Sequence, residues 1–431
     1  MIQSGLSHYR NKRVLLLQGP VGPFFARFAN DLRWADATVF KVNFNGGDRF
    51  FYGDDAISFR DEFAAWPAFF KGLLERLDID VVMLFGDCRK YHVAALEIAK
   101  ERGLEVGVFE EGYLRPDYVT LEQHGVNGNS ALPTNPIFYL NKPTRPAPKA
   151  DPVGNSFFYA AWWACVYTLM AHLLRPAFPH YQHHRRLSLA EALPWSRALW
   201  RKFKYAVGER GIQQRLVTDL SKKYFLVPLQ VHHDAQIRVH SDYESVEQFI
   251  VDVVASFAQS APANTFLVIK HHPLDRGHRD YTALLRRLGA EHRLGSRLIY
   301  LHDQNLPKLL DHARGVIVIN STVGLSALLH KAPLKVCGDA IYKLKGLVYQ
   351  GELNQFWGAA AKEKVDMKLF RAFRDHVIPH TQLNGSFYRR LSIPGSFAGM
   401  RWEKRRDDKT VVQLPGNDAA VHTSLQERSL F

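Results

Sequence analysis

Three polar segments could carry chemistry, and each directly follows a predicted β-strand. The first is Glu110-Glu111-Gly112, with Arg115 three residues further on. Neighbouring carboxylates repel each other, so one of them can hold its proton to a higher pH. In a glycosyl transfer that retains configuration, one carboxylate can attack the sugar while another group moves a proton. The alternative for these residues is a solvated loop with a local salt bridge.

The other two segments are suited to binding a phosphate. Lys270, His272 and Pro273 follow one strand, where Lys and His can meet an anion and proline fixes the loop. Asn320, Ser321 and Thr322 follow another strand and precede a helix, whose free N–H groups form an anion site. An ordinary turn and a helix cap without a ligand are the alternatives. Three polar segments that each follow a predicted strand would arise together by chance less often than any one of them alone.

His232, His233 and Asp234 suggest a metal cluster. Neighbouring residues in a strand point to opposite faces, which gives poor ligand geometry. We therefore expect no metal, and we expect Gln230 and Asp234 to line a binding cleft instead.

Alternating strands and helices must position these side chains. Strands are predicted at 14–17, 38–44, 80–85 and 105–109 and then at 224–228, 265–269, 298–301 and 315–319, with helices between them. This alternation predicts βαβ units and parallel sheets. Ligands bind at the carboxyl edge of such sheets. In the first half that edge carries Gln18, Gly19, Asn45, Asp48, Asp87 and the glutamate pair.

The predicted fold class is α/β, with two Rossmann-like domains that face a cleft in a GT-B-like arrangement. We place an N-terminal acceptor and catalytic domain at 1–150, an apolar and basic helical insertion at 151–215, a C-terminal domain at 216–370, and a helix with a polar tail at 371–431. Dehydrogenases and epimerases share this architecture. However, the first turn lacks the G-x-G-x-x-G pattern, which weakens a dinucleotide interpretation.

The insertion contains an almost wholly apolar run at 157–174, followed by basic residues that include Arg185, Arg186, Arg201, Lys202 and Lys204. About 18 residues is borderline for a membrane span. A buried core helix, a membrane-interface helix and a full span all remain open. Flanking basic residues and aromatic side chains favour the interface zone.

Composition limits the functional classes. The 431 residues are 46% hydrophobic, which excludes a wholly disordered chain. The net charge of +14 predicts an anionic partner: nucleic acid, an anionic membrane or a phosphorylated substrate. Three cysteines without a CxxC pair fit a reducing compartment. No signal-like apolar run stands near the N-terminus, so we expect a cytoplasmic protein.

Several of these segments together resemble capsule polysaccharide biosynthesis proteins of the KpsS type, which are related to KpsC. The resemblance covers roughly residues 10 to 360 and lies in 17–25, 42–48, 109–117, Gln230, Asp234, Lys270-x-His272-Pro273 and 320–324. This family comprises retaining β-Kdo transferases with CMP-Kdo as donor. The resemblance implies a GT-B-like fold in which the domain at 216–370 holds CMP.

The resemblance also implies roles for single residues. His272 and Pro273 would hold the nucleotide, and Ser321 and Thr322 would meet its phosphate. Glu111 would be the nucleophile, with Glu110 or Asp234 as alternatives, because KpsC-type relatives have Glu-Asp-Gly at this place. Arg115 would pair with the Kdo carboxylate. Metal and cofactor would not be required.

The implied reaction places Kdo on a (lyso)phosphatidylglycerol acceptor at the cytoplasmic face of the inner membrane. This step would initiate the poly-Kdo linker of group 2 capsules. Implied partners are an anionic membrane surface, a KpsC-type Kdo transferase and the capsule export complex. One rival function is a non-catalytic capsule assembly or export factor. The other is a nucleic-acid-binding protein, which the missing RNP, zinc-finger and helix-turn-helix signatures disfavour.

Overall fold

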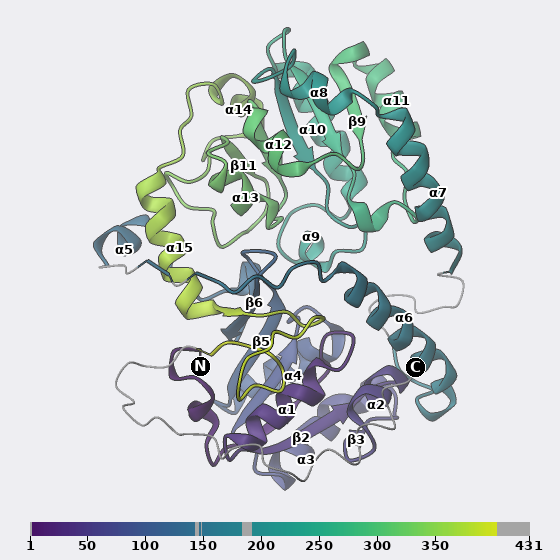
Figure 1. Ribbon diagram of the computed structural model, residues 1–431, viewed down its shortest axis with the longest axis vertical. Helices are drawn as coiled ribbons and strands as arrows, with labels where there is room; N and C mark the ends of the chain where they lie inside the picture. Colours follow the sequence, from purple (N-terminus) through teal and green to yellow (C-terminus); the bar gives the residue numbers. More distant parts are fainter. Residues whose placement is uncertain (1, 143–145, 148, 183–191, 403–431) are drawn as a thin grey trace.

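The computed structural model describes the chain except for residues 1, 143–145, 148, 183–191 and 403–431. Two α/β halves lie one above the other in Figure 1, each built on a sheet with helices on both faces. The predicted fold class, two Rossmann-like domains, is confirmed. The N-terminal half occupies the lower part of the figure and the C-terminal half the upper part.

The N-terminal half contains a seven-stranded sheet in the order β12-β6-β5-β4-β1-β2-β3. Five strands run parallel: β1 (Arg13–Leu16), β2 (Thr38–Asn43), β3 (Ile57–Ser58), β4 (Val81–Phe85) and β5 (Glu105–Glu111). Their apolar runs are typical of strands that are covered on both faces. The covering helices include α1 (Phe24–Trp34), α2 (Gly46–Tyr52), α3 (Trp66–Arg76) and α4 (Lys90–Glu101).

The C-terminal half contains a five-stranded parallel sheet in the order β11-β10-β7-β8-β9. Its strands are β7 (Tyr224–Pro228), β8 (Phe266–Lys270), β9 (Leu298–Leu301), β10 (Gly315–Val318) and β11 (Leu334–Val336). Side chains alternate between two cores: Leu226 and Val268 enter one, while Val227 and Ile269 enter the other. The helices beside the sheet include α8 (Ile212–Val217), α10 (Val246–Ser260), α11 (Thr282–Glu291), α12 (Leu306–His312), α13 (Val323–Leu329) and α14 (Leu353–Ala359).

The end of the described chain returns to the first sheet, which the sequence did not predict. Helix α15 (Met367–Thr381) leads into β12 (Gln382–Asn384), and β12 pairs antiparallel with β6 (Tyr118–Gln123). Beyond β12, Phe387 packs on Phe24 with ring centroids 4.8 Å apart. Residues 382–402 therefore contribute a strand and apolar packing to the N-terminal half.

Helix α6 (Phe157–Leu173), which falls in the apolar run, lies on the surface beside α2. Tyr167 is its single buried residue, so the core-helix interpretation is wrong. Among the described residues, no helix combines the length and the apolar character that crossing a bilayer requires. Arg185 and Arg186 fall outside the described residues.

Tyr167 anchors α6 through its hydroxyl group. The Asn45 side-chain amide donates to this oxygen at 2.7 Å, and the Gln18 amide donates at 3.1 Å. The hydroxyl donates in turn to Asp48 Oδ1 at 2.8 Å. Gly47 lies against the ring, where a Cβ atom would clash. The polar residues that follow β1 and β2 thus hold the helix.

We expect Tyr167→Phe to destabilise the protein by about 1–3 kcal/mol, because it leaves buried polar partners unsatisfied. Tyr159→Phe is the matched control, since Tyr159 is exposed on the same helix. The free energy of unfolding in urea measures both effects. Equal stability of the two variants would contradict the anchor.

Candidate active site

The pleat of β5 separates the two predicted carboxylates. Neighbouring residues of a strand face opposite sides of the sheet, so Glu111 shares a side with Phe109 and Glu110 does not. Tyr388 donates its hydroxyl to Glu111 Oε1 at 2.7 Å, beside Phe387. Glu110 Oε1 accepts the Glu111 N–H at 2.9 Å, and its carboxylate lies near Gly86. The pair therefore does not converge on one point.

The pKa of Glu110 is raised to about 7. Burial is the largest cause, and the negative charges of Glu111 and Asp87 add to it, while the Glu111 N–H and the Arg89 guanidinium oppose it. A carboxyl group with this pKa can hold or release a proton near neutral pH, as general acid–base catalysis requires.

The other polar residues at this edge of the sheet lie together, and their hydrogen bonds go to other groups of the protein. Arg89 donates to Gln18 Oε1 at 3.0 Å and to the Gly19 carbonyl at 3.1 Å. Asp87 Oδ2 accepts the Val126 N–H at 3.1 Å. With Asn45 and Asp48 bonded to Tyr167, these predicted acceptor residues form a buried scaffold beneath the edge.

The two halves meet at the short helix α9 (Ala235–Val239), which lies between them in Figure 1. Asp234 caps this helix by accepting the Gln236 N–H at 3.0 Å. Gln236 Nε2 lies 3.9 Å from the Sγ atom of Cys88, in the N-terminal half. Burial raises the pKa of the Cys88 thiol, and Asp87, Glu110 and Asp234 raise it further. Carboxylates from both halves therefore converge near Cys88.

A hydrogen-bond network fixes Asp234 to the carboxyl edge of the second sheet. Gln230 Nε2 donates to Asp234 Oδ2 at 3.1 Å and to Asn320 Oδ1 at 2.9 Å. Asn320 Nδ2 donates to the Gln236 carbonyl at 2.9 Å. The ends of β7 and β10 and the start of α9 are thereby joined, and Gln230 and Asp234 lie together at this edge.

His272 begins the loop at 272–280, which we call the donor loop because we expect, from the sequence, that His272 and Pro273 hold the donor nucleotide. Its Nδ1 accepts the Leu274 N–H at 3.2 Å, so Nε2 carries the proton. Burial lowers the pKa of His272 to about 4, and the charges of Lys270 and Arg115 contribute. At neutral pH the ring is therefore an uncharged N–H donor. The positive charge of Arg115, in the N-terminal half, therefore acts on a residue of the C-terminal half.

Lys270 and Ser321 have partners within the protein. Lys270 Nζ donates to the His302 carbonyl at 2.9 Å, and burial lowers its pKa. Ser321 Oγ accepts the Val323 N–H at 3.2 Å, whereas the Thr322 side chain makes no cap hydrogen bond to α13. Tyr342 donates its hydroxyl to the Ser321 carbonyl. Both segments are thus held at the same sheet edge.

His232 and His233 occupy a turn rather than a strand, and their ring centroids are 4.7 Å apart. The acidic residue beside them is Asp275 of the donor loop, not Asp234. His232 Nδ1 lies 2.5 Å from Asp275 Oδ1, and the His232 N–H donates to Oδ2 at 2.7 Å. Possible ligand atoms of these three residues lie within 4.8 Å of one another. The observed bonds fasten the donor loop to the turn before Asp234.

Sequence reasoning missed Arg89, Tyr167 and Tyr388. Arg89 follows the predicted strand-end residue Asp87 by two positions, and that spacing could have identified it. Tyr388 contacts Glu111 across 277 residues of sequence, and Tyr167 contacts Asn45 across 122. Local patterns carry no signal for pairings of this kind.

Comparisons with known proteins agree on the family. Residues 80–388 match the family described as capsule polysaccharide biosynthesis protein. The chain is 45% identical over 379 residues to "Capsule polysaccharide export protein KpsS" of Escherichia coli, covering 88% of this chain and 97% of that protein. It is 40% identical over 392 residues to "Capsule polysaccharide modification protein LipB" of Neisseria meningitidis, covering 89% and 93%.

A similar solved structure is the KpsC β-Kdo 2,7-transferase of Thermosulfurimonas dismutans. It shares 15% identity with a TM-score of 0.41, over 88% of this chain and 94% of that one. A likeness this low assigns neither a substrate nor a residue role to the chain.

The raised pKa of Glu110 predicts a pH-dependent stability. An unfolded glutamate titrates near 4.5, so between that pH and about 7 the folded state binds the extra proton. The stabilisation from protonated Glu110 is complete below 4.5 and is lost as the pH rises through 7. Glu110→Gln stays neutral, so its stability relative to wild type should increase from pH 5 to pH 8. Urea unfolding across this range measures the difference.

The control is Glu75→Gln, which removes an exposed carboxylate. A stability difference between wild type and Glu110→Gln that does not change with pH would contradict the raised pKa.

Proposed function

The chain belongs to the family of capsule polysaccharide biosynthesis proteins, and from that premise we propose that it is a retaining glycosyltransferase. In this proposal it transfers Kdo from CMP-Kdo to a (lyso)phosphatidylglycerol acceptor. The observation that carries the proposal is the convergence of Glu110 and Asp234, from opposite halves, at the boundary where both sheets present their carboxyl edges. Two carboxylates with separate environments suit a two-step transfer.

The C-terminal half would bind the donor. His272 presents an uncharged N–H group, and Ser321 follows β10 at the same edge of the sheet. Pro273, Asn320 and Thr322 complete the two loops. Arg115 lies near His272 and could pair with the carboxylate of Kdo, since guanidinium groups bind carboxylates in a bidentate manner.

Retention of configuration requires two displacements at the anomeric carbon. In the first, an Asp234 oxygen attacks that carbon, and the bond to the CMP phosphate breaks with its electron pair leaving on CMP. In the second, the acceptor hydroxyl attacks, Asp234 departs, and Glu110 takes the hydroxyl proton. Asp234 is favoured over Glu111 for two reasons. Gln230, which also bonds Asn320, fixes Asp234 at the carboxyl edge of the second sheet. Glu111 instead accepts a hydrogen bond from Tyr388 on the other side of β5.

We propose that neither a metal ion nor a cofactor takes part. The leaving group CMP carries a single phosphate, so it needs less charge neutralisation than a pyrophosphate. His272 and Arg115 can donate hydrogen bonds to the developing anion.

The lipid acceptor places the reaction at an anionic membrane, at the cytoplasmic face of the inner membrane. Exposed apolar side chains on α6 support this, with Phe157, Phe158 and Trp162 all more than half exposed. Patches of this kind on a soluble protein commonly mark interaction surfaces. A KpsC-type transferase, which would extend the product, and the capsule export complex are the proposed partners.

Mass spectrometry of the lipid product tests the function directly. Purified protein, CMP-Kdo and lyso-phosphatidylglycerol should yield a lipid heavier by Kdo, together with free CMP. A non-catalytic assembly or export factor would leave the lipid and CMP-Kdo unchanged.

We expect CMP to protect the protein against thermal unfolding. A ligand at 100 times its Kd stabilises the folded state by about 2.7 kcal/mol. His272→Ala and Ser321→Ala should lose this protection, while His330→Ala, a control at a partly exposed residue paired with Asp311, should keep it. Full protection in both site variants would show that the donor site is elsewhere.

The proposed nucleophile can be trapped. Intact-protein mass spectrometry after mixing with CMP-Kdo, without acceptor, should show an adduct of one Kdo, and peptide mapping should locate it on Asp234. Asp234→Asn should lose the adduct and lower turnover by orders of magnitude, while CMP protection persists. An adduct on Glu111 would support the prediction from sequence, and an adduct on Glu110 would reverse the proposed roles.

A further inference from the structure

Helix α7 (Ala192–Gly208) reverses the usual arrangement of a surface helix. Large apolar side chains face outward, whereas a charged side chain, Arg201, faces the protein. Its outer face carries Leu199, Trp200, Phe203 and Val207, which are 73%, 61%, 74% and 46% exposed. Its inner stripe instead presents Arg201 and Tyr205, followed by Glu209 just beyond the helix. Surface helices normally bury their apolar stripe, so this outer face requires an apolar environment.

The first half of the inner stripe holds the donor loop. Arg201 donates to the carbonyl oxygens of Arg276 and Arg279 at 2.7 and 3.0 Å. The same guanidinium pairs with Asp280 at 3.4 Å. Gly277 lies so close to the Pro194 carbonyl that a Cβ atom would clash. The far side of the donor loop is thereby fastened to α7.

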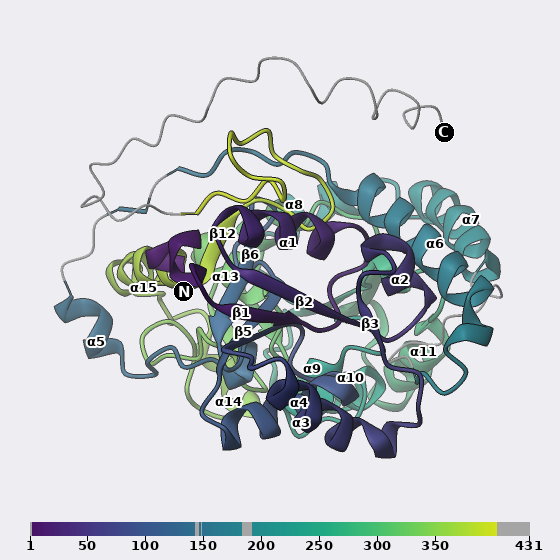
Figure 2. The ribbon, with the colours of Figure 1, turned by 90° about the horizontal axis from the view of Figure 1, so that it is seen from below.

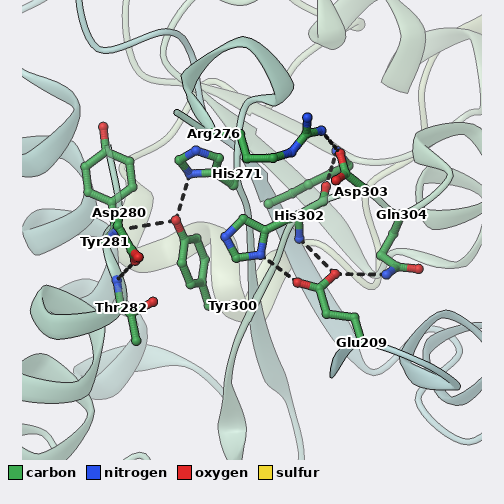
Figure 3. A network of polar contacts seen from close by, with 11 residues as sticks. Glu209, His271, Arg276, Asp280, Tyr281, Thr282, Tyr300, His302, Asp303 and Gln304 are labelled. Carbon is green, nitrogen blue, oxygen red and sulfur yellow. Dashed lines mark hydrogen bonds and ion pairs between the residues drawn. The ribbon is translucent and has the colours of Figure 1, made fainter. Parts of the chain in front are cut away.

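The end of the stripe reaches the base of the same loop (Figure 3). Glu209 Oε1 lies 2.6 Å from His302 Nδ1, and Glu209 Oε2 accepts the Gln304 amide at 2.9 Å. Tyr205 stacks on the His302 ring with centroids 3.4 Å apart. Lys270, two residues before His272, donates to the His302 carbonyl. Helix α7 therefore bonds the donor loop directly through Arg201, and Glu209 reaches the residues just before the loop indirectly, through His302 and Lys270.

The charge pattern of the surface indicates what covers it. Neither α6 nor α7 contains an aspartate or glutamate, and the exposed Lys202 and Lys204 accompany the apolar face of α7. Both helices lie along one flank of the molecule, α6 on the N-terminal half and α7 on the C-terminal half (Figures 1 and 2). Apolar and aromatic side chains interspersed with lysine are typical of segments that enter the headgroup region of anionic bilayers.

We propose that the outer face of α7 inserts into an anionic phospholipid surface and that this contact orders the donor loop, so that lipid binding prepares the donor site. The inference rests on the proposed function for the role of the loop. The physical reason is that a helix held by lipid loses freedom. The loop that Arg201 bonds to this helix then has less entropy to lose on binding a ligand.

Hydrogen exchange of the backbone at 272–280 tests this without any nucleotide. Vesicles containing phosphatidylglycerol should slow exchange in this segment several-fold in the full-length protein, and phosphatidylcholine vesicles should not. Phe203→Ser and Leu199→Ser together should weaken vesicle binding, to which α6 also contributes, and should abolish the slowed exchange. Ile137→Ser is the control, because Ile137 is 60% exposed on α5 (Pro136–Asn141), at the opposite flank.

Two variants test the inner contacts. Glu209→Gln and Arg201→Lys should still bind vesicles, yet the lipid should no longer slow exchange at 272–280. Unchanged exchange at 272–280 in the wild type with bound vesicles would overturn the inference. Full slowing in Glu209→Gln and Arg201→Lys would overturn it as well, and so would slowed exchange that survives Phe203→Ser and Leu199→Ser together. The exchange experiment contains no CMP. If CMP fails to bind in the separate thermal-protection experiment, the proposed function is rejected, and the effect of lipid on exchange can still be interpreted.

Discussion

The antiparallel pairing of β12 with β6 ties the end of the described chain to the sheet of the N-terminal half. It returns the chain to the first sheet after the C-terminal half is complete, so the two halves are joined by two crossings rather than one. Gln382 Oε1 accepts the Tyr113 N–H at 3.0 Å, which fixes the turn just after β5. Tyr388, which follows β12, then holds Glu111. The position of the carboxylates relative to the C-terminal half follows from this return.

Much of the fold could be predicted from sequence because it depends on local patterns. The strands at 14–17, 80–85, 224–228 and 315–319 are short, mostly apolar runs, and each lies within one or two residues of its predicted place. Gln18, Gly86, Gln230 or Asn320 follows each run within two residues. Strand order and the antiparallel edge were not predictable in this way. They depend on β6 and β12, which are separated by more than 250 residues and have no distinctive composition.

The candidate site shows the same division. Residues at strand ends, such as Gln230, Asn320 and His272, could be identified because parallel strands bring their carboxyl ends to one edge. What each side chain does there could not be read from the sequence. Asn45 and Asp48 looked like substrate ligands but bind Tyr167, and the adjacent Glu110 and Glu111 are separated by the pleat of β5. The bonds of Asn45 and Asp48 depend on a tyrosine more than one hundred residues away in the sequence. The separation of Glu110 from Glu111 depends on the pleat of β5.

We propose that the carboxyl edge of the second sheet holds a cytidine nucleotide opposite Glu110. A crystal structure of the protein with CMP tests this proposal most directly. Density for CMP should lie between the donor loop and residues 320–322, with the phosphate near His272 and Ser321 and directed toward Asp234. Density for CMP in the N-terminal half, around Gln18 and Arg89, would contradict the proposed donor site.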